Sequence, residues 1–244
     1  MIKYSIIITN YNYHKFLDRC ISSSLNQDKK KSFEVLIVDD GSSSESIKII
    51  KKYKNKSKNN FKAFFLKNNG LEKAANFGIL KAKGKYIIRV DADDFLASNF
   101  LTKVDNFIIK YPNYKFYYSN YFIVDEDNKI ISTKVLPKFS TKEITERGDF
   151  LATGTVYEKK TIIKFGLYDT KVKNCGLENY SLILKLILSK IKGLRINEPL
   201  FFFRVHKKNM SKIKMKEIKN YGSFLAAKNG LKFYKQNIHH PNFI

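Results

Sequence analysis

The first ninety residues alternate between two kinds of segment, and this alternation constrains the fold more than any other feature of the sequence. Four short apolar runs, rich in β-branched and aromatic residues, lie at 4–9, 33–38, 61–66 and 86–90. Between them, apolar residues recur at helical spacing. Strands that alternate with helices predict a doubly wound α/β unit with a parallel sheet. At 244 residues, the chain is long enough to bury a substantial core.

The fourth apolar run ends in three carboxylates, those of Asp91, Asp93 and Asp94. An isolated Asp-x-Asp is most simply a solvated acidic turn. Here it follows a buried strand, and open α/β sheets bind ligands at the carboxyl ends of their strands. The polar strand ends at 9–12 and 39–40 are expected at the same edge. Crowded carboxylates suit a hard divalent cation, Mg²⁺ or Mn²⁺, which often shares its coordination with substrate phosphates. The pattern therefore favours a nucleotide site with a metal.

The composition restricts the class of partner. Forty-six Lys and Arg residues against 22 Asp and Glu residues give a net charge of +24, which favours anionic partners. The lysines are spread along the whole chain without a nucleic-acid-binding motif, so no specific nucleic-acid partner is predicted. Two cysteines and no apolar run of about 20 residues lead us to expect a cytoplasmic protein.

The second half of the chain has a different pattern. A helix over 100–109, a β-hairpin over 116–133, a helix beyond 174 and a strand over 194–203 are predicted. We see no Pro-, Gly- or Ser-rich linker before about residue 212. We therefore predict one domain over 1–212, with halves 1–95 and 96–212, followed by a lysine-rich helical tail over 213–244.

Five ordered motifs together resemble the inverting glycosyltransferases of family 2, which have the GT-A fold. They are SIIITNYN at 5–12, VDDGS at 38–42, NGLEKAANFG at 69–78, DADD at 91–94 and RVHKKNMS at 204–211. The resemblance covers roughly residues 3–212. It implies a Rossmann-like, mostly parallel sheet flanked by helices, with a C-terminal helical extension. It also implies a nucleotide-binding first half and an acceptor-binding second half.

The resemblance implies a reaction and a donor site. A sugar would move from a nucleotide-sugar, with a UDP-sugar expected, to a hydroxyl of a glycan or lipid-linked saccharide in bacterial-type surface polysaccharide synthesis. Thr9 and Tyr11 would hold the base, and Asp39 would accept a hydrogen bond from it. Asp93 would reach the ribose hydroxyls, and Arg204 would contact phosphate.

The metal would be Mn²⁺ or Mg²⁺ by the same resemblance. Asp94 would bind it directly. Asp91 would bind it through water or support the turn. His206 would be a further metal ligand or a contact to the diphosphate.

The general base departs from the family pattern. Family members usually carry it as the Asp of a Glu-Asp pair, and the matching residues here are Glu178 and Asn179. An amide cannot take a proton. Three interpretations remain open: Glu178 serves through a shifted helix start, another carboxylate such as Asp169 serves, or the protein is a catalytically impaired donor-binding or scaffold homologue. We expect Glu178.

The acceptor contacts are expected in the second half, at Thr153, Gly154 and Thr155 and on the aromatic hairpin with Tyr117, Tyr118 and Tyr121. The basic tail could hold the protein peripherally on the inner face of an anionic cell membrane. A solvated helix packed on the domain and a dimerisation helix are the alternatives.

Overall fold

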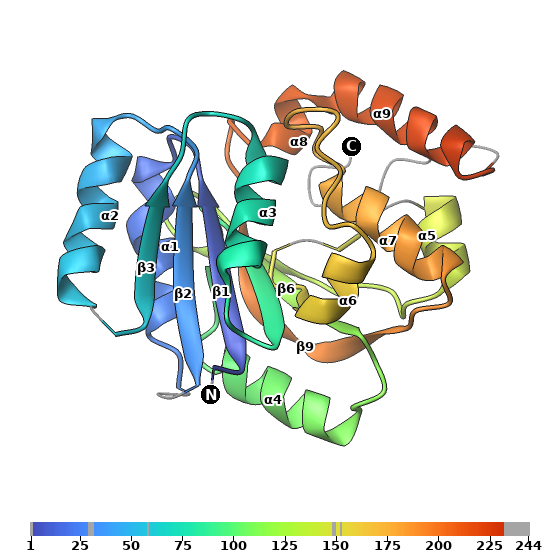
Figure 1. Ribbon diagram of the computed structural model, residues 1–244, viewed down its shortest axis with the longest axis horizontal. Helices are drawn as coiled ribbons and strands as arrows, with labels where there is room; N and C mark the ends of the chain where they lie inside the picture. The colour runs from blue at the N-terminus through green and yellow to red at the C-terminus, as the bar shows by residue number, and fades with distance from the viewer. Residues whose placement is uncertain (1, 29–31, 58, 148–149, 152, 232–244) are drawn as a thin grey trace.

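The computed structural model describes residues 2–28, 32–57, 59–147, 150–151 and 153–231. Within these residues, nine strands form one sheet that continues through both halves of the chain (Figure 1). The strand order is β3-β2-β1-β4-β8-β6-β9-β5, and β7 pairs with β6 outside this path. The mixed α/β architecture that was predicted is confirmed. The division into domains and halves stays a prediction, and the sheet is continuous across it.

The first half is the parallel part of the sheet. Its strands are β1 (Tyr4–Asn10), β2 (Phe33–Asp39), β3 (Phe61–Phe65) and β4 (Tyr86–Asp91). Its helices are α1 (His14–Leu25), α2 (Ser44–Lys56) and α3 (Leu71–Lys81). Every residue of β1 and β2 is buried, as expected for central strands of a parallel sheet covered on both faces. Helix α2 continues three residues beyond Tyr53, into a lysine-rich stretch.

One glycine lets α3 lie close to the sheet. A Cβ atom on Gly78 would stand 2.6 Å from a methyl group of Ile7 and 3.1 Å from one of Val38. The absence of a side chain at residue 78 therefore sets how closely the helix approaches β1 and β2. This close packing places the start of α3 beside the strand ends.

The second half adds antiparallel and mixed pairing. Its strands are β5 (Phe95–Leu96), β6 (Phe116–Val124), β7 (Ile130–Lys134), β8 (Val156–Glu158) and β9 (Gly193–Arg204). The predicted hairpin is β6–β7, and β9 pairs with β6 in parallel. Sequence patterns miss β5, because two residues carry no periodicity. It forms because Phe95 pairs with Phe202 on β9 and their rings stack at 4.3 Å.

Helices complete the second half. They are α4 (Phe100–Lys110), α5 (Thr141–Arg147), α6 (Lys159–Lys164), α7 (Glu178–Leu188), α8 (Met210–Ile213) and α9 (Met215–Lys228). The predicted tail helix is α9, which lies above α7 in Figure 1 and buries Ile218, Tyr221 and Leu225. This is the packing expected of the solvated-helix alternative. The remainder of the tail, 232–244, lies outside the described residues. Among the residues that the structure describes, no helix has the length and apolar character needed to span a bilayer.

Candidate active site

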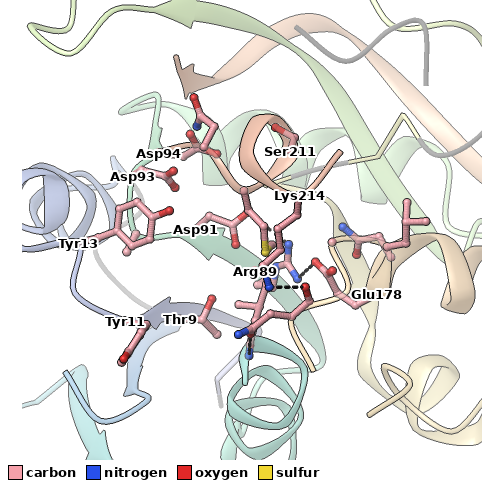
Figure 2. Close-up of a pocket in the computed structure, with 18 of the residues that line it drawn as sticks. Thr9, Tyr11, Tyr13, Arg89, Asp91, Asp93, Asp94, Glu178, Ser211 and Lys214 are labelled. Atoms are coloured by element: carbon pink, nitrogen blue, oxygen red, sulfur yellow. Dashed lines mark hydrogen bonds and ion pairs between the residues drawn. The ribbon is translucent and has the colours of Figure 1, made fainter. Parts of the chain in front are cut away.

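A cavity of about 450 Å³ opens at the carboxyl ends of β1 and β4. Figure 2 shows Asp91, Asp93 and Asp94 on one side of it, Glu178 on the other, and Arg89 between them. The segment from α8 into α9 contributes Ser211 and Lys214 to its wall. The cavity lies at the sheet edge where the strand pattern predicted a ligand site, and its volume is within the range of small-molecule sites.

The three aspartates form a cluster whose negative charge is only partly offset, by Arg89 beside Asp91. Burial, together with the neighbouring charges of Asp93 and Asp91, raises the pKa of Asp94 well above its ordinary value. Burial also raises the pKa of Asp91, although the Arg89 guanidinium opposes the rise. Oδ1 of Asp91 is buried, and no described residue donates a hydrogen bond to it. Carboxylates that are costly to ionise, with an unpartnered oxygen at a cavity, fit a site for a divalent cation.

The hydrogen bonds of His206 indicate which tautomer its neutral imidazole adopts. The backbone N–H of Lys208 donates to Nδ1 of His206 at 3.1 Å, so Nδ1 carries no proton. Neutral imidazole then carries its proton on Nε2, which lies 3.0 Å from Oδ2 of Asp93. In this arrangement, Nε2 donates and offers no lone pair to a metal. Of the two predicted roles for His206, this geometry favours a hydrogen bond to an anionic oxygen over metal ligation.

A second group of possible metal ligands lies nearby, formed by Glu72, Cys175 and Glu178. Both carboxylate oxygens of Glu72 accept backbone N–H groups, those of Asn174 and Cys175. Burial raises the pKa of the Cys175 thiol far above neutrality, so it stays protonated. A thiol binds metal as the thiolate, and the Glu72 carboxylate is already engaged. This group therefore braces the loop that leads into α7.

Arg89 is the cation at the centre of the cavity. Its Nη1 donates to Oε1 of Glu178 at 2.5 Å, and its Nη2 lies 3.3 Å from Oδ2 of Asp91. The side chains of Arg89 and Glu178 are only 7% and 6% exposed. Oε2 of Glu178 accepts no hydrogen bond from any described residue, and Glu178 lines the cavity. One oxygen of this carboxylate is thus held while the other is unpartnered.

The residues predicted to contact the nucleotide base differ in their position relative to the cavity. Tyr11 is 48% exposed and lines the cavity, so its ring has an open face. Thr9 lines it too, and its buried Oγ1 has no hydrogen-bond partner among the described residues. Asp39 lies behind the wall, where its carboxylate accepts hydrogen bonds from Asn10 Nδ2 at 2.6 Å and Ser42 N–H at 2.9 Å. In this conformation, Asp39 orders the loop and is not presented to a base.

Arg204 does not match its predicted phosphate contact. The residue is buried, and its guanidinium donates to the backbone carbonyls of Asp93, Asp125 and Glu126 and to Oδ1 of Asn128. Its backbone N–H donates to Oδ1 of Asp94 at 2.9 Å. Because all three guanidinium nitrogens are engaged with protein oxygens, the structure corrects this prediction. Arg204 ties the acidic turn to the β6–β7 connection.

The predicted acceptor contacts lie mostly behind the cavity. Thr153 and Thr155 are buried. Thr153 Oγ1 accepts the N–H of Asp91, and the N–H of Gly154 donates to the carbonyl of Arg89. These residues support β4 and do not line the cavity, which corrects their assignment as direct acceptor contacts. On the aromatic hairpin, the hydroxyl groups of Tyr117 and Tyr118 donate to backbone carbonyls. Of these three hairpin tyrosines, all of them among the described residues, only Tyr121 lines the cavity.

Asp169 is the other residue that was considered as the general base. Asp169 lies outside the cavity lining, and its Oδ1 accepts the N–H of Lys171. Asn179, by contrast, is buried and lines the cavity beside Glu178.

Sequence reasoning missed two cations of the cavity. Arg89 had a visible signal, since a charged residue interrupts an otherwise apolar strand and must find a partner when buried. Lys214 had none, because it follows the last motif in a lysine-rich segment. Its Nζ donates to the backbone carbonyl of Asn174 at 3.2 Å, so the start of the tail reaches the loop before α7.

Comparison with known proteins gives a consistent match. The sequence profile described as "Glycosyl transferase family 2" matches residues 5–168. An uncharacterized glycosyltransferase of Haemophilus influenzae is 30% identical over 215 residues, which cover 87% of this chain and 83% of that protein. The poly(ribitol-phosphate) beta-N-acetylglucosaminyltransferase TarS of Staphylococcus aureus is 36% identical over 99 residues, 39% of this chain and only 17% of TarS. The minor teichoic acid biosynthesis protein GgaA of Bacillus subtilis is 28% identical, with 85% of this chain and 48% of GgaA covered.

Solved structures match the fold over nearly the whole chain. The crystal structure of S. aureus TarS 1–349 in complex with UDP-GlcNAc has a TM-score of 0.75 at 19% identity, covering 93% of this chain and 66% of that one. A mannosyltransferase from Pyrobaculum calidifontis, in complex with GDP-Man and Mn²⁺, has a TM-score of 0.70 at 13% identity, covering 93% and 63%. The predicted GT-A fold is confirmed by these likenesses.

Proposed function

Because the chain belongs to glycosyl transferase family 2, we propose that it moves a sugar from a UDP-sugar to a hydroxyl group of a bacterial-type surface polymer. One observation carries this proposal. A single cavity at the strand ends holds an aspartate cluster whose charge Arg89 offsets only in part, opposite a carboxylate, Glu178, with an unpartnered oxygen. Donor binding and proton removal need these two features on opposite sides of the reacting carbon.

The donor would lie between Tyr11 and the aspartates. The open ring of Tyr11 suits stacking on the base, and Thr9 Oγ1 offers a polar partner. The ammonium group of Lys214 is suited to the diphosphate oxygens, and the Nε2–H of His206 would orient Asp93 beside them. UDP is favoured as the nucleotide because TarS, a relative, binds UDP-GlcNAc in its crystal structure.

Asp94 and Asp91 are the residues that would hold Mn²⁺ or Mg²⁺. Few protein ligands suffice, because such ions often complete their coordination with substrate phosphates and water. When bound, the ion would neutralise the charge that develops on the departing diphosphate.

In the proposed reaction, the acceptor oxygen forms a bond to the anomeric carbon as the bond to the diphosphate oxygen breaks. The electron pair of that bond leaves with the nucleoside diphosphate. Oε2 of Glu178 takes the proton of the attacking hydroxyl, while Arg89 holds Oε1. Attack from the side opposite the leaving group inverts the anomeric configuration.

The acceptor is proposed from the relatives. TarS and GgaA are named for poly(ribitol-phosphate) and teichoic acid chemistry, so a phosphate-containing surface polymer or its lipid-linked precursor is the substrate class favoured here. Its assembly would place the protein at the inner face of the cell membrane, with α9 as a possible contact surface because its outer face carries lysines.

A second candidate function follows from Asn179. The usual proton acceptor of the family is an amide here, and the adjacent Glu178 is paired with Arg89. A catalytically impaired homologue that binds the donor and serves as a scaffold would have the same features.

Two measurements test these proposals. Thermal unfolding with UDP, GDP, CDP or dTDP, each with Mn²⁺ or with EDTA, reports donor binding. A ligand at about 100 times its Kd stabilises the fold by about 2.7 kcal/mol. We expect a rise in the unfolding midpoint only with UDP and Mn²⁺ together, and no rise with any nucleotide would contradict the donor site. Release of UDP from UDP-sugars with acceptor then separates the enzyme from the scaffold.

A further inference from the structure

A second cavity, of about 760 Å³, lies between the start of β9, the C-terminal end of α7 and the segment before α5. Helix α5 packs beside α7, at the right of Figure 1. We call this cavity the basic groove, and its cationic residues are Lys138, Lys190, Lys192 and Arg195. We propose that the basic groove binds the phosphodiester backbone of an anionic acceptor polymer, whose end reaches Glu178. The proposal rests on the proposed function for its connection to transfer.

The charge of the groove is unbalanced. Four cations line it, and the described lining includes no Asp or Glu residue. Across the described chain, no ion pair holds Lys138, Lys190 or Lys192. Glu198, which follows the lining residue Asn197 in sequence, is paired with Lys103 at 2.7 Å. A concave surface lined only by cations concentrates the electrostatic field and favours the binding of an anion.

The remaining wall suits a chain of alternating phosphates and polyols. Ser140 and Thr141 supply hydroxyl groups, and Tyr114 and Phe139 supply ring surfaces. Hydroxyl groups and rings contact polyol units, while ammonium and guanidinium groups contact phosphates. The groove is concave, whereas a bilayer surface requires a flat or convex basic face. These features favour a polymer strand over a membrane as its occupant.

The groove and the active-site cavity share structural elements. Glu178 lies at the first turn of α7, and Ile187, near its other end, lines the groove. Nine residues of helix span about 14 Å, so a polymer of a few repeat units could occupy both sites. An aromatic series also joins them, since Tyr118 packs on Phe139 of the groove and on Phe150 of the active-site cavity.

The test measures binding directly and does not require transfer. The probe is a glycerol phosphate oligomer with a fluorescent end label, titrated with the full chain at low salt, with dextran of similar length as the uncharged comparison. The groove variant is Lys190→Gln/Lys192→Gln. The matched control is Lys51→Gln/Lys54→Gln, which removes the same charge from the exposed face of α2. Lys138→Gln/Lys192→Gln is a second groove variant, in case the first does not fold.

We expect the groove variants to bind the oligomer about 30-fold more weakly, from two lost charge contacts, and the control variant to bind as the wild type does. Equal weakening in the groove and control variants, or none in either, would overturn the proposal. Groove-dependent binding to phosphatidylglycerol vesicles without binding to the oligomer would also overturn it, in favour of a membrane contact.

Failure of the proposed function is distinguishable from failure of this inference. All variants should keep the UDP-dependent thermal shift, since none of the substituted lysines lines the active-site cavity. Loss of UDP binding or transfer in the wild type, with groove-dependent oligomer binding retained, would contradict the proposed function alone. With transfer present, the groove variants should raise the KM for a long acceptor and leave that for a single repeat unit unchanged.

Discussion

Arg89 holds one oxygen of Glu178 and leaves the other unpartnered at the active-site cavity. Their Nη1–Oε1 distance is 2.5 Å, and both side chains are almost fully buried. A buried carboxylate without a counter-charge is costly, and Arg89 supplies that charge in the middle of a strand. Because Arg89 also contacts Asp91, the same cation connects the aspartate cluster and the proposed base.

Replacing the proposed base should separate chemistry from binding. Glu178→Gln keeps the shape of the side chain and removes its ability to take a proton. We expect kcat for transfer to fall by about 10²- to 10⁴-fold, while the thermal shift with UDP and Mn²⁺ remains. Steady-state release of UDP is the measurement. Asp169→Asn is the matched control, and a larger loss in this variant would make Asp169 the base.

Asn179→Asp tests whether the natural site is disabled. The substitution adds a carboxylate to a cavity wall where Arg89 already faces Glu178 and Asp91. With Glu178 as base, we expect no gain in transfer and a lower unfolding midpoint from the added repulsion. A large gain in kcat would instead support the impaired-homologue candidate.

Arg89→Leu should destabilise the fold. It leaves the buried Glu178 carboxylate and the partly buried Asp91 carboxylate without their cation, and breaking a buried pair typically costs about 3–5 kcal/mol. Urea unfolding would measure the loss, and Arg89→Lys should recover part of it because the charge remains while the second contact is lost. Lys85→Leu, at the exposed residue directly before β4, is the control for removing one cation, and an equal cost there would contradict the assignment.

The aspartate cluster should make the unliganded protein less stable as pH rises. The pKa of Asp94 is raised in the folded state, so its protonated form favours folding. This contribution is present below the unfolded-state value of about 3.9 and is lost as pH rises through the folded-state pKa. Asp94→Asn keeps an oxygen to accept the N–H of Arg204. At pH 8 without ligand, the variant should therefore unfold at a higher temperature than the wild type, and the difference should shrink toward pH 4.

Addition of UDP and Mn²⁺ should reverse that order. The wild type gains stability from the ligand, whereas Asp94→Asn loses a proposed metal ligand and should gain little. Calorimetry with EDTA, Mn²⁺ alone and Mn²⁺ with UDP gives the comparison. A wild-type-like shift in the variant would contradict the role of Asp94.

Tyr11→Ala tests the proposed contact between Tyr11 and the nucleotide base. Stacking of an aromatic side chain on a base contributes about 1–3 kcal/mol, so the Kd for UDP should rise by roughly 5- to 150-fold. Tyr11→Phe keeps the ring and should bind nearly as the wild type. Since Tyr11 is half exposed, unfolding without ligand should change little in both variants, and unchanged affinity in Tyr11→Ala would exclude stacking there.

The sequence by itself determined the parallel half of this protein and the place of its site. Each strand there is a predominantly apolar run and each helix follows within a few residues. Asp91 ends β4, and Asp93 and Asp94 follow it directly. These features are local, so periodicity and strand-end logic suffice to find them. The ordered motifs also identified the family.

Only the tertiary structure decided which of the predicted residues face the active-site cavity. Arg204, Thr153 and Asp39 have the residue types expected of ligand contacts, yet their polar atoms bond to other protein groups. Arg89 reaches Glu178 across 89 positions of sequence. The basic groove likewise draws its cations from segments that are about 50 residues apart. No local pattern specifies such partners, because burial and pairing depend on which segments the fold brings together.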